Sequence, residues 1–88
     1  MEILKVASTT DVAKLAGAIA GIAEDGKQVE LRAVGAGPVN VVMKALAVAR
    51  GYTAPAGMDL VCIPAFMNYE DGGKPRTMMR LIVTDKNR

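Results

Sequence analysis

Apolar residues recur along the chain with two different periods, which predict four strands and two helices. Residues 2 to 7, 28 to 34, 60 to 66 and 77 to 84 are short, aliphatic-rich segments and predict the strands. The second, QVELRAV, alternates apolar and polar side chains as a half-buried strand does. The third, LVCIPAF, is apolar on both faces, which is typical of a central strand, provided that its proline lies at a bulge or where the missing N–H faces no neighbour.

The remaining apolar segments have the 3.6-residue period of helices. A cluster of N-cap residues at 8 to 11 precedes the first helix, and Gly26 ends it. The apolar positions of this helix are Val12, Leu15, Ala16, Ile19, Ile22 and Ala23. The second helix is predicted to start at Gly37 and Pro38, because proline is favoured in the first turn, and to stop at Gly51.

The predicted order is β-α-β-α-β-β in a single domain over residues 1 to 88. This is an α/β two-layer sandwich with both helices on one face of a four-stranded sheet, whose other face is uncovered within the chain. Between residues 38 and 50 the only charged residues are Lys44 and Arg50. A helix that is apolar over most of its surface is covered over most of its surface, so we expect a second subunit to pack on it.

The corner between the second strand and the second helix has two interpretations. Gly35 and Gly37 match the start of a dinucleotide-binding G-x-G-x-x-G motif, but Asn40 stands in place of the third glycine. One interpretation is a tight corner between helix and sheet. The other is an anion site, where the N–H groups near Val39 and Asn40 and the helix dipole hold a phosphate. Lys44 lies one turn after Asn40 on the same helix face and can act with it.

Residues 68 to 75, NYEDGGKP, predict the turn of a hairpin between the last two strands. Lys74 and Arg76 flank this tip, and Arg80 lies further along the last strand. These cations are either solvated surface groups or a flexible basic arm that contacts phosphates. Phe66, near the end of the preceding strand, is interpreted as a core residue.

Composition narrows the possible functions. The chain is 51% hydrophobic and carries a net charge of +2, so a positive surface requires segregation of charge rather than excess. It has no histidine and one cysteine, which excludes a disulfide within the chain, a histidine metal site and a Ser-His-Asp triad. No pair of carboxylates is placed for acid–base catalysis. We therefore predict that the protein is not an enzyme and uses no metal or cofactor.

Three further observations concern partners and location. The chain has two tyrosines, one phenylalanine and no tryptophan, so stacking of bases on aromatic rings is not expected to be the main mode of any nucleic-acid binding. The segment MEILKVAS carries charges and does not resemble a signal peptide, and no apolar run approaches about 18 residues. We predict no membrane partner and a cytoplasmic location.

Several segments strongly resemble the stage V sporulation protein S family. They are AGAIAG (16 to 21), AVGAGPVN (33 to 40), KALAVARGYTAPAGMDLVCIPAF (44 to 66) and RTMMRLIV (76 to 83), so the resemblance covers nearly the whole chain. That family resembles the Alba superfamily, whose small β-α-β-α-β-β domains dimerise and bind DNA or RNA. The segment RAVGAG, at 32 to 37, is similar to the first part of an R-A-x-G-x-A-type segment of Alba proteins.

The resemblance implies a non-enzymatic nucleic-acid-binding regulator of sporulation or development, acting as a homodimer or larger homo-oligomer on DNA or RNA with little sequence preference. The basic hairpin of Alba proteins maps onto Lys74 and Arg76. The adjacent lysines that Alba proteins carry at the start of the first helix are replaced by residues 8 to 10, STT, with only Lys14 nearby. The predicted contact residues are Arg32, Gly35, Gly37, Asn40, Lys44, Lys74, Arg76 and Lys14.

Two alternatives stand beside this prediction. The first is a protein-interaction or assembly module without nucleic-acid binding, which the low net charge favours. The second is a small-ligand sensor or enzyme that uses residues 35 to 40 as an anion cradle. The absence of histidine and of a catalytic grouping argues against catalysis.

Overall fold

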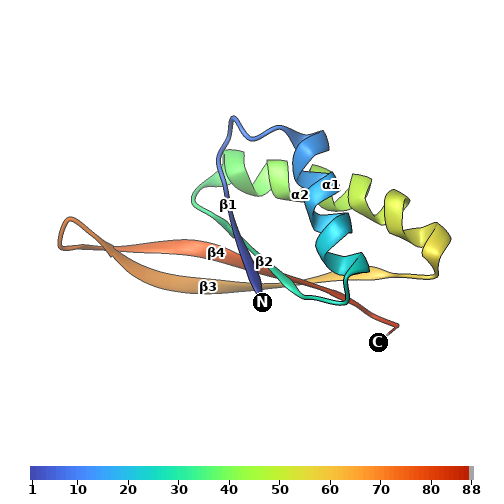
Figure 1. Cartoon of the computed structure of the whole chain (residues 1–88). Helices are drawn as coiled ribbons and strands as arrows, with labels where there is room; N and C mark the ends of the chain where they lie inside the picture. The colour runs from blue at the N-terminus through green and yellow to red at the C-terminus, as the bar shows by residue number, and fades with distance from the viewer. Residues whose placement is uncertain (88) are drawn as a thin grey trace.

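The computed structural model describes residues 1–87 and has two layers, a mixed sheet and a pair of helices (Figure 1). Within these residues the elements are β1 (Glu2–Val6), α1 (Val12–Glu24), β2 (Val29–Ala33), α2 (Ala36–Thr53), the 3-10 helix η1 (Ala54–Ala56), β3 (Leu60–Asp71) and β4 (Lys74–Asp85). The strand order is β1-β2-β4-β3, with β1 and β2 parallel and the other two pairs antiparallel. Both helices cover the same face of the sheet (Figure 1). The predicted element order and two-layer arrangement are confirmed.

The alternation in β2 decides which side chains face the helices. Val29, Leu31 and Ala33 are buried on the helix side, whereas Glu30 and Arg32 point to the other face. The buried residues of the two helices are Leu15, Ala16, Ile19, Ala20, Ala23, Val41, Val42, Ala45, Leu46, Ala49 and Thr53. The hydrophobic core therefore lies between the helices and one face of the sheet, and within residues 1–87 no element covers the other face (Figure 1).

The first helix begins and ends where the sequence predicts. Asp11 is its N-cap, and its side chain accepts a hydrogen bond from the backbone N–H of Lys14 at 2.9 Å. Gly26 follows the helix with a φ of 78°, a conformation that favours glycine. These two residues set the length of α1 and so the point at which β2 starts.

The prediction that residues 60 to 66 form a central strand is wrong, because β3 lies at the edge of the sheet and β4 takes the central place. An edge strand has a neighbouring strand on one side only, so every second backbone N–H points away from that neighbour and makes no ladder hydrogen bond. Pro64, which has no N–H, therefore fits into the uninterrupted pairing of β3 with β4. Phe66, interpreted as a core residue, is instead 77% exposed. It is paired with Met79, which is opposite the last residue of β2, so it lies at the margin of the region that the helices cover.

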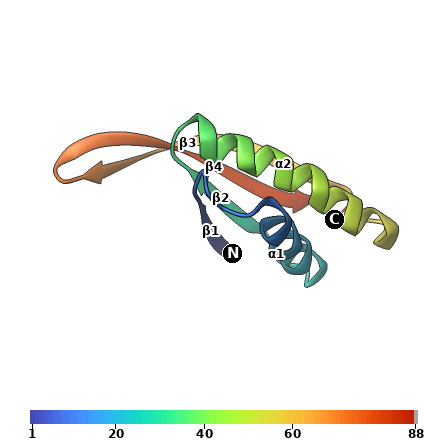
Figure 2. The ribbon, with the colours of Figure 1, turned by 90° about the horizontal axis from the view of Figure 1, so that it is seen from above.

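The predicted hairpin between the last two strands is confirmed, but its turn is much shorter than residues 68 to 75. β3 and β4 are each 12 residues long and pair without interruption. The turn is made by Gly72 and Gly73 alone, whose φ values of 59° and 80° suit a two-residue type I′ turn. Because β2 ends at Ala33, opposite Met79, the hairpin continues beyond it as a two-stranded ribbon that projects from the body (Figures 1 and 2).

The second helix is longer than predicted at both ends. It begins at Ala36 with Gly35 as N-cap, so Pro38 is its third residue rather than its first. The first four N–H groups of a helix have no partner within the helix, so proline loses no hydrogen bond at either place. The helix also passes through Gly51 and ends at Thr53.

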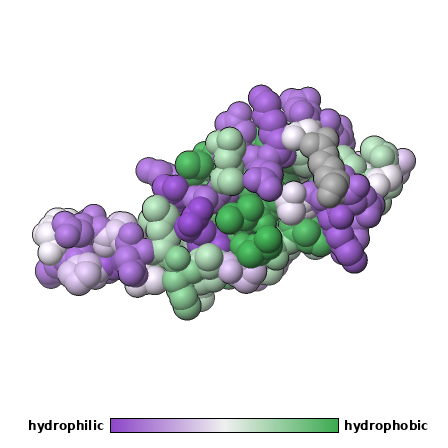
Figure 3. Space-filling view, turned by 90° about the horizontal axis from the view of Figure 1, so that it is seen from below, coloured by the Kyte–Doolittle hydropathy of each residue, from purple (hydrophilic) through white to green (hydrophobic). Residues whose placement is uncertain are grey.

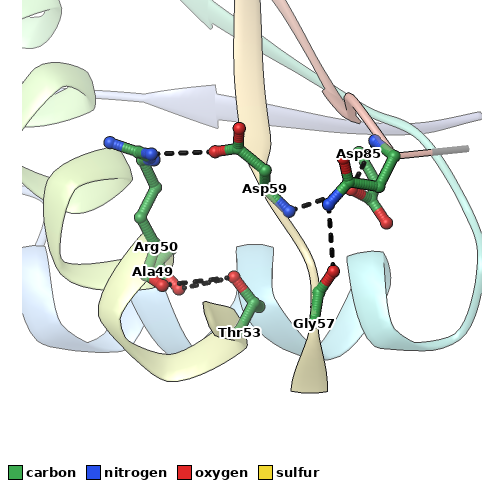
Figure 4. Close-up of polar contacts among 7 residues, drawn as sticks. Ala49, Arg50, Thr53, Gly57, Asp59 and Asp85 are labelled. Carbon is green, nitrogen blue, oxygen red and sulfur yellow. Dashed lines mark hydrogen bonds and ion pairs between the residues drawn. The ribbon is translucent and has the colours of Figure 1, made fainter. Parts of the chain in front are cut away.

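Contacts at the end of α2 explain why Gly51 does not stop the helix. The hydroxyl of the buried Thr53 donates a hydrogen bond to a backbone carbonyl one turn earlier, at 3.2 Å, and Arg50 forms a 2.8 Å ion pair with Asp59 (Figure 4). The backbone N–H of Asp59 donates to a carboxylate oxygen of Asp85 at 2.9 Å. These contacts join the end of α2 to the start of β3 and the end of β4.

Candidate functional site

Three cationic side chains lie side by side on the face of the sheet that the helices leave bare. Lys5 of β1 pairs with Arg32 of β2, and Arg32 pairs with Arg80 of β4. We call these three residues the cation row. The row forms because the alternation in each strand sends them to the face opposite the core. Like charges directly opposite each other on neighbouring strands destabilise a sheet, so the row needs a compensating anion.

Glu30 supplies that anion. One carboxylate oxygen accepts a hydrogen bond from Nε of Arg32 at 2.6 Å, and the other accepts one from Nη2 of Arg80 at 2.6 Å. The Glu30 side chain is only 2% exposed, whereas those of Arg32 and Arg80 are 25% and 34% exposed. The hydrogen bonds from Arg80 and then Arg32 hold the pKa of Glu30 below its ordinary value of 4.5, although burial opposes this. Three cations and one carboxylate leave the group two positive charges at neutral pH.

The bare sheet face also carries apolar residues, which account for the burial of Glu30. Ile3 of β1 and Ile82 of β4 are its two cross-strand neighbours, and Ile63 of β3 pairs with Ile82. Ile3 and Ile63 are 48% and 55% exposed. Figure 3 shows apolar surface gathered near the middle of this face, with hydrophilic surface next to it and over the projecting hairpin.

A hollow of about 580 Å³ opens beside the cation row, where β1 and β2 end and the hairpin continues. We call it the corner hollow. Its lining residues are Lys5, Val6, Ala7, Ser8, Arg32, Val34, Pro38, Tyr69 and Met78. Two of them are cationic and none is acidic. The loops that follow the parallel strands β1 and β2 form part of its wall, at the carboxyl ends of strands where open α/β sheets bind ligands.

The structure favours glycine at the two positions that begin α2 for different reasons, a backbone conformation at Gly35 and a close contact at Gly37. Gly35 has a φ of 91° and a ψ of 171°, a region that is essentially restricted to glycine. At Gly37 an added Cβ would lie 3.2 Å from Cβ of Ser8, in the loop after β1. A tight corner therefore accounts for both residues, and anion binding by this corner stays a prediction.

The other predicted contact residues are exposed and lie on three separate surfaces: Lys74 and Arg76 near the end of the hairpin, Asn40 and Lys44 on α2, and Lys14 at the start of α1. Arg76 forms a 3.5 Å ion pair with Asp71 across the hairpin. Arg32 alone among the eight lines the corner hollow, next to the corner between β2 and α2.

Sequence reasoning misses Lys5 and Tyr69 as members of the same site as Arg32. The alternation predicts which face of its own strand each of Lys5 and Arg32 occupies. It does not predict that the two strands pair in the register that makes these residues neighbours. Tyr69 is even less accessible to prediction, because the sequence places it in a turn rather than in β3.

Residues 2–86 match the family described as Stage V sporulation protein S (SpoVS). The chain belongs to this family. The matched segment contains every helix and strand described above. Membership in the SpoVS family confirms the resemblance found in the sequence and supports a sporulation-related role for the chain.

The described residues show neither a membrane-spanning helix nor a cluster of metal-binding side chains. Neither helix within residues 1–87 has both the length and the apolar character needed to cross a membrane. The same residues hold no group of three or more histidine, cysteine, aspartate or glutamate side chains that could bind a metal ion.

Proposed function

We propose that this SpoVS-family chain is a non-enzymatic regulator that binds nucleic acid through its phosphates and acts as a homodimer. The observation that carries the proposal is the cation row on a bare sheet face, with the buried Glu30 as the carboxylate that bridges two of its members. Phosphate contacts supply most of the affinity of proteins for nucleic acid. Because the net charge of the chain is only +2, a positive surface has to come from cations gathered in one place, and the cation row gathers three of them.

The projecting hairpin supports the same proposal. Lys74 and Arg76 are exposed near the end of a two-stranded ribbon that stands clear of the body (Figure 2). A two-stranded ribbon fits the major groove of DNA, and basic residues along it meet the phosphates that border the groove. Contacts of this kind position a protein but carry no sequence information, so we expect binding with little sequence preference.

Exposed apolar side chains support the homodimer. Met43 on α2 is 45% exposed, and Phe66 on the edge strand β3 is 77% exposed. Removing such surface from water is favourable, by about 25 cal/mol for each Å² of apolar area. A second copy that packs along α2 and the edge of β3 would bury these residues and add a second hairpin to the particle. Light scattering should give twice the 9.2 kDa mass of the chain, and Phe66→Glu should shift the mass toward one chain.

A matched pair of charge reversals tests the nucleic-acid proposal. Lys74→Glu with Arg76→Glu changes the hairpin, and Lys27→Glu with Lys86→Glu changes exposed lysines at the other end of the sheet. Each pair lowers the net charge by four, from +2 to −2. Lys86 is about 40 Å along β4 from the hairpin turn, well beyond the roughly 8 Å screening length of physiological salt.

We expect the hairpin pair to weaken binding to every sequence by about 30-fold near 150 mM salt. Each phosphate contact contributes about 0.9 to the slope of the logarithm of the binding constant against the logarithm of salt concentration, so losing two contacts changes the binding constant by the salt concentration raised to a power of about 1.8. The control pair should change it less than about threefold. Equal losses in both pairs would show that only net charge matters. A loss confined to one sequence would contradict phosphate binding.

The second candidate function is a protein assembly module that does not bind nucleic acid, which the exposed apolar residues on two surfaces favour. Ile3 and Ile63 are exposed on the bare sheet face, away from Met43 and Phe66. If both surfaces are covered by other copies, light scattering should give a mass well above that of a dimer. A bare dimer that binds labelled nucleic acid would eliminate this candidate.

A further inference from the structure

The corner hollow combines positive charge, an aromatic ring and a concave shape at one place. At about 580 Å³ it falls within the range of about 300 to 1,000 Å³ that small-molecule sites occupy. The projecting hairpin forms one wall, and the loops after β1 and β2 form the other. A duplex is too wide to enter such a space, but a single nucleotide is not.

Arg32 is held in position to donate into the hollow. Its Nε donates to the buried carboxylate of Glu30 at 2.6 Å, which fixes the plane of the guanidinium group. Its two terminal Nη groups have no hydrogen-bond partner among residues 1–87, although the side chain is mostly buried and lines the hollow. Guanidinium groups with free parallel N–H donors bind phosphate in a two-point manner. Lys5, the next residue of the cation row, lines the same hollow and adds a second charge.

Tyr69 supplies the aromatic surface. It lies four residues after Ala65, which pairs with Arg80, so alternation places it on the bare face together with the cation row. Tyr69 lines the hollow together with Met78. Unpaired bases bind proteins by stacking on aromatic rings, next to cations that hold the phosphate. The scarcity of aromatic residues argues against an extended stacking platform, but one base needs only one ring.

We infer that the corner hollow binds one unpaired nucleotide of a nucleic-acid strand, with its base against Tyr69 and its phosphate on Arg32 and Lys5. This inference rests on the proposed function and extends it, because it predicts that the chain prefers single strands, or duplexes with an unpaired residue, to a continuous duplex. A base inside a continuous duplex is already stacked on its neighbours and cannot reach the ring without being extruded.

The chain offers its own optical probe, since it has two tyrosines and no tryptophan. In Tyr52→Phe, tyrosine emission comes from Tyr69 alone, and in Tyr69→Phe it comes from Tyr52 alone. Tyr52 is exposed and lies about 24 Å along α2 from the first residue of that helix. Both changes keep an aromatic ring at each position, so both variants should bind equally well.

The experiment titrates both variants with a single-stranded oligonucleotide of about 12 nucleotides, within the range that small single-strand-binding domains cover. Anisotropy of a labelled copy of the strand measures binding in parallel. We expect quenching of the emission from Tyr69 and no change in that from Tyr52. Tyr69→Leu should weaken single-strand binding about tenfold, whereas Tyr52→Leu should leave it unchanged.

Four results would overturn the inference, and the first three separate it from the proposed function. Binding of the strand without quenching of Tyr69 would leave nucleic-acid binding in place and remove the hollow as its site. Equal or tighter binding of a continuous duplex, with no effect of Tyr69→Leu, would do the same. Quenching by free AMP but not by the oligonucleotide would replace the strand by a free nucleotide. Absence of binding to any nucleic acid would remove both proposals.

Discussion

Glu30 should be the single carboxylate on which the stability of the bare sheet face depends most. The variant Glu30→Gln keeps the shape of the side chain but removes its charge and turns one acceptor oxygen into a donor. That donor then faces a guanidinium group, and Lys5, Arg32 and Arg80 are left as three neighbouring cations without a counter-charge. The expected outcome is a folded but clearly less stable protein.

The magnitude follows from the two hydrogen bonds. A hydrogen bond to a charged group contributes about 1.5 to 3 kcal/mol, and breaking a buried ion pair costs about 3 to 5 kcal/mol. The two arginines are 25% and 34% exposed, so water recovers part of their solvation and the lower end applies. We expect a loss of about 3 kcal/mol in the free energy of unfolding. For a domain of this size that lowers the melting temperature by about 12 to 24 °C.

Urea denaturation followed by circular dichroism measures this loss, at one fixed protein concentration because the stability of a dimer depends on concentration. Glu24→Gln, at the exposed last residue of α1, is the matched control and should change stability by less than about 0.5 kcal/mol. If Glu30→Gln also stays within about 0.5 kcal/mol of the wild type, Glu30 does not hold the cation row together, and the reasoning is refuted.

The same variant has a pH signature with a definite sign. The pKa of Glu30 is lower in the folded protein than its ordinary value of 4.5, so its contribution is fully present above that value and is lost as the pH falls through the lowered folded pKa. The wild type should therefore lose stability below about pH 4.5, and the difference between wild type and Glu30→Gln should shrink there. A difference that stays constant down to about pH 3 would contradict this.

Two further predictions concern the ends of the helices. Gly35→Ala should destabilise the protein by about 1 to 3 kcal/mol, because its φ of 91° strains any side chain even though no atom lies within 4 Å of the added Cβ. Gly37→Ala should cost less, because Gly37 has an ordinary φ and its added Cβ only meets Ser8 at 3.2 Å. Urea midpoints of the two variants in the opposite order would contradict the strain argument. Asp11→Ala should cost about 1 kcal/mol through loss of the 2.9 Å cap on α1, and an unchanged midpoint would mean that water replaces the cap.

Local signals along the chain predicted the parts of the fold that depend on neighbouring residues. The limits of α1 at Asp11 and Gly26 could be predicted because capping and positive φ depend on local residues. The alternation of QVELRAV placed Val29, Leu31 and Ala33 in the core correctly. The order of elements followed from the same periods and led to the two-layer arrangement.

The errors arose where tertiary pairing decides the outcome. β3 was predicted to be central because it is apolar, but its place in the sheet depends on which strand β4 pairs with. Gly51 did not stop α2, because Thr53 is held in the core beyond it. The candidate site shows the same limit, since Lys5, Arg32 and Arg80 come from three strands and become neighbours only through the register.

The most direct test of phosphate binding is a salt titration of affinity by fluorescence anisotropy. Labelled duplex DNA, single-stranded DNA and RNA are compared at about 50 and 200 mM salt. Affinity should fall steeply with salt in a linear log–log relation, and the slope divided by about 0.9 for duplex DNA, or about 0.7 for single strands, counts the phosphates neutralised. Absence of binding to all three at the lower salt concentration, or affinity that does not change with salt, would contradict the account and leave the assembly module as the function to pursue.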